Sequence, residues 1–206
     1  MPPMKLYSAP HPSPNPRRVR ICAAMKRIDL PEIMLDLRAR DHRRDDHLAR
    51  NALGQVPVLE LEDGTMLSET VAICRYLDSL HPEPPLFGRD ALEGARVEMW
   101  TRRIETQLGE PVRMFWRHAH PATAALLTQH REFGESNRTH VARAMTWLEG
   151  EMATGPDYLA ADIPTMADIA ALTIVDFATL IGLDPLAGVP TIGAWHARMT
   201  ADAAGA

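Results

Sequence analysis

A short hairpin followed at once by an amphipathic helix is the feature of this sequence that most constrains its fold. Residues 58–61 and 65–67 are apolar segments that flank Asp63-Gly64, and an Asp-Gly pair in this position strongly indicates a β-hairpin. From residue 69 onward apolar side chains recur with the spacing of one helical face, at Ile73, Tyr76, Leu77 and Leu80. The sequence therefore predicts two paired strands and a helix in immediate succession.

The residues before this hairpin complete a small α/β domain. Residues 4–7 and 33–37 have the pattern of strands, residues 17–28 follow a helical pattern, and residues 45–51 indicate a short helix. The predicted order is strand, helix, strand, helix, strand, strand, helix. Such an order gives a small mixed sheet with helices on its faces.

The residues after the proline-rich segment 81–85 differ in composition. From Asp90 onward Val and Ile become sparse, and the strong helix formers Ala, Leu, Met, Glu and Arg dominate. We expect an all-helical second domain, with helices near residues 90–117, 122–152, 165–181 and 191–199. Gly109 and Pro111 should bend the first of these helices.

The sharpest local signal in this second part is Thr165-Met166-Ala167-Asp168. Thr165 can cap a helix while Asp168 reaches back to the cap residue, and Ile163 in front can act as a hydrophobic staple. This capping chemistry predicts where a helix begins, and by itself it would fit any helical protein.

The bulk composition excludes several classes of protein. The chain has 22 basic and 27 acidic residues and a formal net charge of -5, so it lacks the basic excess that nucleic-acid binding requires. No apolar run approaches the length that spans a membrane, and no signal peptide is expected at the N-terminus. The two cysteines, Cys22 and Cys74, form no disulfide framework and are expected to be buried and inert. A reducing cytoplasm is the expected location.

Several motifs together resemble the cytosolic glutathione transferases. The residues Asn51-Ala52-Leu53-Gly54-Gln55-Val56-Pro57-Val58-Leu59, the Asp63-Gly64 turn and Leu67-Ser68-Glu69-Thr70-Val71-Ala72-Ile73 are similar to the glutathione-binding core of that family. Ser13-Pro14-Asn15-Pro16 resembles the start of its first helix, and Thr165–Ile169 resembles its C-terminal capping signature. The matches follow the family's order and spacing over nearly the whole chain.

The resemblance implies a fold and an arrangement of domains. It implies an α/β thioredoxin-like N-terminal domain over residues 1–83 and an all-α C-terminal domain over residues 84–206, which is the glutathione transferase architecture. It also implies glutathione as co-substrate, a second site for a small hydrophobic electrophile, and a homodimer.

This sequence departs from the family pattern at several positions. Ala52 replaces the usual proline, and Thr70 replaces the usual serine but keeps its hydroxyl. No tyrosine stands in the activating position, since Tyr7 falls inside the first strand, and no cysteine occupies the N-terminal active turn. The resemblance is therefore to bacterial and fungal types with an atypical Ser, Asn and His active site.

Such an enzyme must lower the pKa of the glutathione thiol, because the thiolate is the nucleophile. Ser13 and Asn15, at the start of the first helix, are the two candidates for contact with the sulfur. A hydroxyl or amide donor backed by a helix N-terminus would stabilise the anion. The alternative is that both residues only shape the turn and cap the helix.

The remaining glutathione contacts follow from the resemblance. Val56 should pair its backbone N–H and C=O with the cysteinyl part, and Pro57 should follow a cis peptide bond. Glu69 and the N–H of Thr70 should bind the ammonium and carboxylate of the γ-glutamyl part; the alternative is that they only complement the helix dipole. His42 and Gln55 are the candidates for the glycyl carboxylate, in a neighbourhood made basic by four arginines, Arg38, Arg40, Arg43 and Arg44.

The second domain should supply the other half of the active site. Phe115 and Trp116 are candidates for the wall of the electrophile pocket, although aromatic residues at such spacing often belong to a core. The resemblance implies that His118 helps to stabilise the sulfur. His118 and His120 lie two residues apart and point to different sides of a helix, so we expect no metal site.

Glutathione conjugation to a small apolar electrophile is the function that these residues favour. The Ser13-Pro14-Asn15 turn keeps glutathione-dependent disulfide reduction as an alternative within the enzymes, together with peroxidase activity. A non-catalytic glutathione-binding or regulatory module is the alternative from another class.

Overall fold

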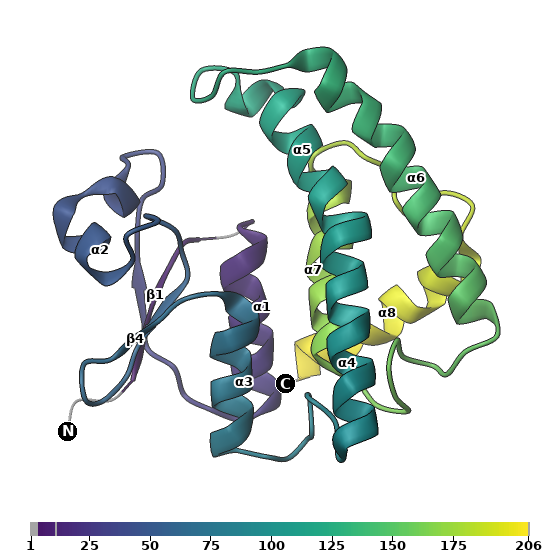
Figure 1. Ribbon diagram of the computed structural model, residues 1–206, viewed down its shortest axis with the longest axis horizontal. Helices are drawn as coiled ribbons and strands as arrows, with labels where there is room; N and C mark the ends of the chain where they lie inside the picture. Colours follow the sequence, from purple (N-terminus) through teal and green to yellow (C-terminus); the bar gives the residue numbers. More distant parts are fainter. Residues whose placement is uncertain (1–3, 11, 206) are drawn as a thin grey trace. The chain divides into compact units, whose positions relative to one another are not determined.

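The computed structural model describes residues 4–10 and 12–205 (Figure 1). The chain divides into two compact units, one that ends at Leu86 and one that begins at Phe87, and each is described by itself.

A four-stranded mixed sheet forms the centre of the first unit. Its strands are β1 (Lys5–Ser8), β2 (Glu32–Met34), β3 (Val58–Glu60) and β4 (Met66–Leu67), in the spatial order β2-β1-β3-β4. Strand β2 is parallel to β1, and the other neighbours are antiparallel, as a thioredoxin-like domain requires. The predicted hairpin is confirmed: Gly64 adopts φ +86°, and the Thr65 N–H donates to the Asp63 carboxylate at 2.8 Å. The second strand is shorter than predicted and ends at Met34 rather than Leu37.

Helices cover both faces of this sheet. Helices α1 (Pro14–Met25) and α3 (Thr70–Leu80) pack side by side on one face, and α2 (Asp45–Arg50) lies beyond the other (Figure 1). The core between the sheet and the α1–α3 pair contains Leu6, Val19, Leu59, Ile73 and Leu77, all fully buried. Cys22 and Cys74 belong to the same core, as predicted, and burial raises the pKa of the Cys74 thiol.

The proline-rich linker is attached to the first unit by a buried cation. Lys26, at the end of α1, pairs with Asp78 and donates to the carbonyl groups of Pro82 and Pro84. Asp78 also accepts from the Leu86 N–H at 3.1 Å. A buried ammonium needs such partners because its desolvation is costly. These bonds hold the linker to the α/β unit as far as Leu86.

The second unit is helical throughout, as predicted. Its helices are α4 (Ala91–Arg103), α5 (Glu110–His118), α6 (Arg131–Ala153), α7 (Met166–Leu180) and α8 (Pro190–Gly205). Helix α7 is the central one, since most of its residues are buried, and α5 packs along α6. A π-helical turn (Ile104–Gly109) joins α4 to α5, so the irregularity lies just before Pro111, which has no N–H to donate.

The helix expected over residues 122–152 begins later than predicted. Helix α6 starts at Arg131, and only a short 3-10 turn (Pro121–Thr123) forms before it. Side chains hold the intervening loop: the Thr123 hydroxyl donates to the Trp116 carbonyl at 2.7 Å, and the Gln129 amide donates to the His120 carbonyl at 2.9 Å. These tertiary bonds override the helix propensity of an Ala- and Leu-rich segment.

The start of α7 confirms the predicted capping box. One carboxylate oxygen of Asp168 accepts from both the N–H and the hydroxyl of Thr165, at 2.9 and 2.7 Å. The other accepts from the Leu159 N–H at 2.9 Å and from the Trp195 indole at 3.0 Å. Burial raises the pKa of the Asp168 carboxyl, and these donors oppose the rise. Within residues 4–10 and 12–205, no helix has the length and apolarity to cross a membrane.

Candidate functional site

The topology of the first unit brings the predicted glutathione-binding residues to one edge of the sheet. Strand β1 ends at the edge where the antiparallel β3 begins, and β4 ends at the same edge. Helix α1 follows β1, and α3 follows β4 directly. The start of both helices and the residues before β3 therefore lie near one another, and the Arg18 guanidinium joins α1 to the Thr70 hydroxyl of α3 at 3.5 Å.

Val56 offers an unpaired backbone N–H and an unpaired backbone C=O at this edge. The Val56–Pro57 bond is cis, as predicted, and Pro57 is buried. Neither the N–H nor the C=O of Val56 forms a hydrogen bond with another residue of the described chain. Backbone groups in a folded domain are nearly always paired, so this donor and acceptor are available to an extended ligand.

The start of α3 is also open. Thr70 is its first residue and is 8% exposed, whereas Glu69 before it is exposed and its side chain does not cap the helix. Glu69 adopts φ +67° and ψ 117°, a conformation that disfavours any residue with a Cβ. Such backbone strain persists where the surrounding structure holds it, and it is concentrated at binding sites. The first N–H groups of α3 have no partner within the helix and suit an anion.

Ser13 and Asn15 stand at the start of α1. Ser13 is the N-cap residue and is half-buried, but its hydroxyl makes no capping hydrogen bond. Asn15 lies in the first turn and is exposed. The alternative role of Ser13 as a helix cap is thus not realised, which leaves its hydroxyl free for another partner.

His42 lies in a short 3-10 helix (Asp41–Arg43) and is half-buried. Burial lowers its pKa, and the positive charge of Arg43 lowers it further, so the imidazole is neutral at neutral pH. A ring N–H of His42 can donate a hydrogen bond to a carboxylate. Of the basic residues near it, Arg43 donates to the Leu53 carbonyl at 3.1 Å and Arg44 pairs with Asp41 at 3.0 Å.

Gln55 has an exposed side chain and a carbonyl that is already engaged. That carbonyl faces the ring of His47, Nε2 to oxygen 3.0 Å, and accepts from the Asn51 side chain at 3.1 Å. Neither His47 nor Asn51 was predicted to have a role. The position of Asn51 within the motif Asn51–Leu59 was the only sequence feature that pointed to this residue, and no pattern in the sequence pointed to His47.

The predicted residues of the helical unit lie on α5. Phe115 is 2% exposed and packs beneath the Arg138 guanidinium, 4.3 Å from its ring centroid, so it belongs to the core of this unit. Trp116 is half-buried and contacts Phe177, with ring centroids 5.3 Å apart. His118 accepts the His130 N–H on its Nδ1 at 3.3 Å and therefore also supports the start of α6.

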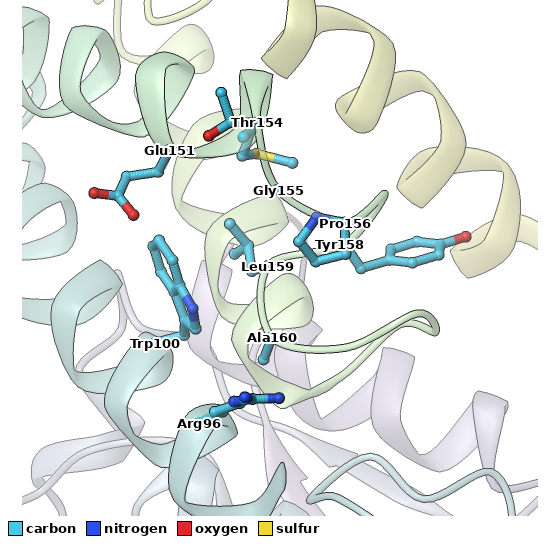
Figure 2. A pocket seen from close by; sticks show the side chains of 10 residues that line it. Arg96, Trp100, Glu151, Thr154, Gly155, Pro156, Tyr158, Leu159 and Ala160 are labelled. Carbon is cyan, nitrogen blue, oxygen red and sulfur yellow. The ribbon is translucent and has the colours of Figure 1, made fainter.

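The helical unit has a pocket of its own, with a volume of about 320 Å³ (Figure 2). Its walls come from α4 and from the end of α6 with the residues that follow: Arg96, Trp100, Glu151, Met152, Thr154, Gly155, Pro156, Tyr158, Leu159 and Ala160. None of the residues predicted for the glutathione or electrophile site lines it. Burial and a hydrogen bond to Asp202 raise the pKa of Tyr158 to about 12, so this tyrosine is protonated at neutral pH.

No group of three or more His, Cys, Asp or Glu residues in the described part of the chain is placed to hold a metal ion. His118 and His130 have ring centroids 5.6 Å apart. The other ring in contact with His118 is that of Phe133, which cannot bind a metal ion.

Comparisons with known proteins identify the family of the chain. Residues 12–80 match the family model "Glutathione S-transferase, N-terminal domain", and residues 112–203 match "Glutathione S-transferase, C-terminal domain". Glutathione S-transferase 2 of Saccharomyces cerevisiae is 34% identical over 95% of this chain and 85% of its own length.

Solved structures give the same result. A glutathione S-transferase domain-containing protein from Marinobacter aquaeolei is 32% identical with a TM-score of 0.88, over 96% of this chain and 97% of its own. Gtt2 from Saccharomyces cerevisiae is 32% identical with a TM-score of 0.87, over 95% of each chain. The protein belongs to the glutathione S-transferase family.

Proposed function

We propose that this protein binds glutathione, stabilises its thiolate and transfers it to a small apolar electrophile. The unpaired N–H and C=O of Val56, in the same unit as the uncapped start of α3, are the observation that carries the proposal. Glutathione is an extended peptide with two carboxylates and an amine, and an unpaired N–H and C=O in one residue suit the pairing of such a backbone.

The charged ends of glutathione have matching partners in the same unit. The γ-glutamyl carboxylate would accept from the first N–H groups of α3, at Thr70, and its ammonium would pair with Glu69. The glycyl carboxylate would accept from neutral His42 and from the exposed Gln55 side chain. Val56 and Pro57 would line the cysteinyl part between these two ends.

The sulfur would lie against the start of α1. The free Ser13 hydroxyl is one donor to it, the Asn15 amide is the other, and the helix dipole favours a negative charge there. His118 is proposed as a third contributor from the helical unit, and Phe115 and Trp116 as apolar residues near the electrophile. Among these two, the half-buried Trp116 is better suited than the core residue Phe115.

Glutathione is the only cofactor in this proposal, as co-substrate, and no metal is required. On the basis of the resemblance to the family, the proposal also includes that the protein is a homodimer and is located in the cytoplasm.

Calorimetric titration of the full chain with reduced glutathione tests the binding, and the absorbance change of a chlorinated nitrobenzene tests the transfer. Micromolar to millimolar binding with conjugation supports the proposal. Binding without conjugation, but with reduction of a mixed glutathione disulfide or of a hydroperoxide, would favour the reductase or peroxidase alternative. Binding with none of these activities would favour a regulatory module.

Titration of the bound thiol by its ultraviolet absorbance identifies the sulfur donor. Each pKa unit corresponds to about 1.4 kcal/mol of thiolate stabilisation, so loss of the main donor should raise the bound thiol pKa by about one unit. Ser13→Ala and Asn15→Ala are compared with wild type. The variant with the larger rise identifies the residue that contacts the sulfur, and no rise in either would exclude both.

A further inference from the structure

One carbonyl beside the proposed glutathione site is held by two buried side chains. The Gln55 carbonyl lies 3.0 Å from His47 Nε2 and 3.1 Å from Asn51 Nδ2. His47 is 1% exposed and Asn51 is 8% exposed. Both side chains come from α2 or the residue just after it, and Gln55 directly precedes Val56.

The chemistry of these contacts fixes the state of both side chains. A carbonyl oxygen can only accept, so the proton of His47 must be on Nε2. His47 Nδ1 is buried with no hydrogen-bond partner among the described residues. Asn51 is oriented in turn, because its Oδ1 accepts the Leu53 N–H at 3.1 Å and its amide nitrogen is left to face Gln55.

The direction of the Gln55 carbonyl sets the direction of the Val56 N–H. Both groups belong to one planar peptide unit, in which a trans bond points them in opposite directions. The only cis bonds in the described chain precede Pro57 and Pro84, so the Gln55–Val56 bond is trans. His47 and Asn51 hold the Gln55 carbonyl on its buried side, so the unpaired Val56 N–H points in the opposite direction, away from these two side chains.

The turn before Gln55 leaves little room for another orientation. Gly54 adopts φ +58°, and its N–H donates to the Asn51 carbonyl at 2.8 Å. A Cβ at this position would lie 2.8 Å from the His42 carbonyl oxygen, so the chain passes too close for any other residue.

We infer that His47 and Asn51 are positioning residues, which aim the Val56 N–H at the peptide backbone of glutathione without touching the ligand. The inference rests on the proposed binding of glutathione at Val56. It assigns a binding role to α2, in which Asp45 and Asp46 are exposed and Arg50 stacks over the Tyr7 ring, 4.5 Å from its centroid.

Substitution of His47 separates this role from a structural one. His47→Leu keeps the volume and removes the donor, whereas His47→Gln returns an N–H near the position of Nε2. We expect His47→Leu to raise the KM for glutathione about tenfold with kcat within about twofold, because a misaimed donor weakens binding while the sulfur contacts remain. His47→Gln should return KM to within about threefold of wild type. Asn51→Asp, which keeps the acceptor for Leu53 and removes the donor, should act in the same direction as His47→Leu.

Asn137→Leu is the matched control. Asn137 is also buried and also donates to a backbone carbonyl, that of Phe133 at 2.6 Å, but it lies in the helical unit. It should lower thermal stability and leave KM unchanged. A rise in KM with Asn137→Leu as large as that with His47→Leu would overturn the inference, and so would a wild-type KM in His47→Leu.

A readout without glutathione separates failure of this inference from failure of the proposed function. The nitrogen chemical shifts of the His47 ring report its tautomer, and the carbonyl carbon shift of Gln55 reports its hydrogen bonds. We expect the Nε2–H tautomer, and a Gln55 shift that changes in His47→Leu and recovers in His47→Gln. An unchanged Gln55 shift in a folded His47→Leu variant would overturn the inference. A wild-type protein with the expected shifts that does not bind glutathione would overturn the proposed function and, with it, the role of this peptide in binding.

Discussion

Two helix starts in this protein are built in opposite ways. At the start of α7, Thr165 and Asp168 form a capping box, and the Asp168 carboxylate, 0% exposed, accepts four hydrogen bonds from within the same unit. At the start of α3, Glu69 is exposed, has a positive φ and caps nothing. One helix start is capped by side chains of its own unit, and the other has no side-chain cap.

This difference separates stability from binding. The donors at the start of α7 are used within the unit, so they stabilise the fold and have nothing left to offer. The first N–H groups of α3 have no backbone partner among the described residues, and Glu69 before them has a strained backbone, which costs stability and suits an anion. Substitutions at the two starts should therefore affect different measurements.

Asp168→Ala should have the largest effect. It leaves buried donors from Thr165, Leu159 and Trp195 without an acceptor, and we expect the free energy of unfolding to fall by about 3–5 kcal/mol. Urea denaturation of the full chain measures the loss. Asp162→Ala, at an exposed carboxylate close by in sequence, is the control and should change far less. An equal loss in both variants would remove the distinction between closed and open helix starts.

Glu69→Ala should reverse this pattern. Loss of a charged partner for the γ-glutamyl ammonium should weaken glutathione binding about 10- to 100-fold, since hydrogen bonds to charged groups contribute about 1.5–3 kcal/mol. The free energy of unfolding should not fall, because Glu69 makes no capping bond. Calorimetric titration and urea denaturation of the same samples measure both quantities. Glu62→Ala in the hairpin turn is the matched control, and a comparable loss of affinity there would contradict a specific role for Glu69.

Glu69→Gly sharpens the comparison further. Glycine adopts positive φ without a Cβ clash, so relief of strain should exceed the added entropy of the unfolded chain and raise stability by about 0.5–1 kcal/mol over Glu69→Ala. Binding should be as weak as in Glu69→Ala, because both variants lack the carboxylate. A Gly variant no more stable than the Ala variant would mean that the strain at this position is too small to matter.

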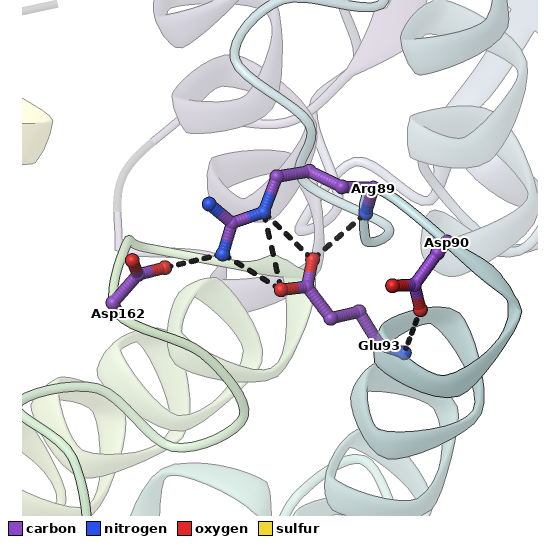
Figure 3. A network of polar contacts seen from close by, with 4 residues as sticks. All are labelled: Arg89, Asp90, Glu93 and Asp162. Atoms are coloured by element: carbon purple, nitrogen blue, oxygen red, sulfur yellow. Dashed lines mark hydrogen bonds and ion pairs between the residues drawn. The ribbon is translucent and has the colours of Figure 1, made fainter.

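The start of α4 is a third case, because side chains cap it at an exposed position. A substitution there should have the smallest effect on stability. Asp90 accepts the Glu93 N–H at 2.9 Å, while Arg89 bonds Glu93 and reaches Asp162 at 2.5 Å (Figure 3). The hydrogen bonds from Arg89 lower the pKa of Glu93 to about 2. This pKa is lower in the folded state than in the unfolded state. The stability that ionised Glu93 contributes to the fold is therefore complete above the unfolded pKa of 4.5, and it is lost as the pH falls from 4.5 toward 2.

Thermal melts of wild type and Glu93→Gln over this pH range test that sign. The wild type should be slightly more stable at pH 7, and the difference should shrink as the pH falls through 4.5 toward 2. Added salt should also reduce it, since exposed charges are screened. A difference that grows in acid would contradict the depressed pKa of Glu93.

Much of the fold follows from local patterns in the sequence. The Asp63-Gly64 turn, helix α3 and the Thr165–Asp168 box each depend on residues a few positions apart, and each was predicted correctly, although Leu80 of the predicted apolar face is 46% exposed. The residues expected at the glutathione site came from the motif around Val56 and Glu69, which is also local. The same reasoning failed for the start of α6, where Thr123 and Gln129 bond to α5 and its end across a loop.

The sequence alone therefore determined most of the elements and their order, because propensity, turn chemistry and capping act over one or two helical turns. The residues expected at the glutathione site came from the resemblance of the motifs to the family. The tertiary structure decided which backbone groups stay unpaired. The N–H and C=O of Val56 have no partner among the described residues, His47 and Asn51 hold the carbonyl before Val56, and the Ser13 hydroxyl does not cap α1. Several of these features depend on contacts that form only when the strands have paired and α2 has packed. A hydrogen bond is specific to a distance and a direction, and no one-dimensional pattern contains either.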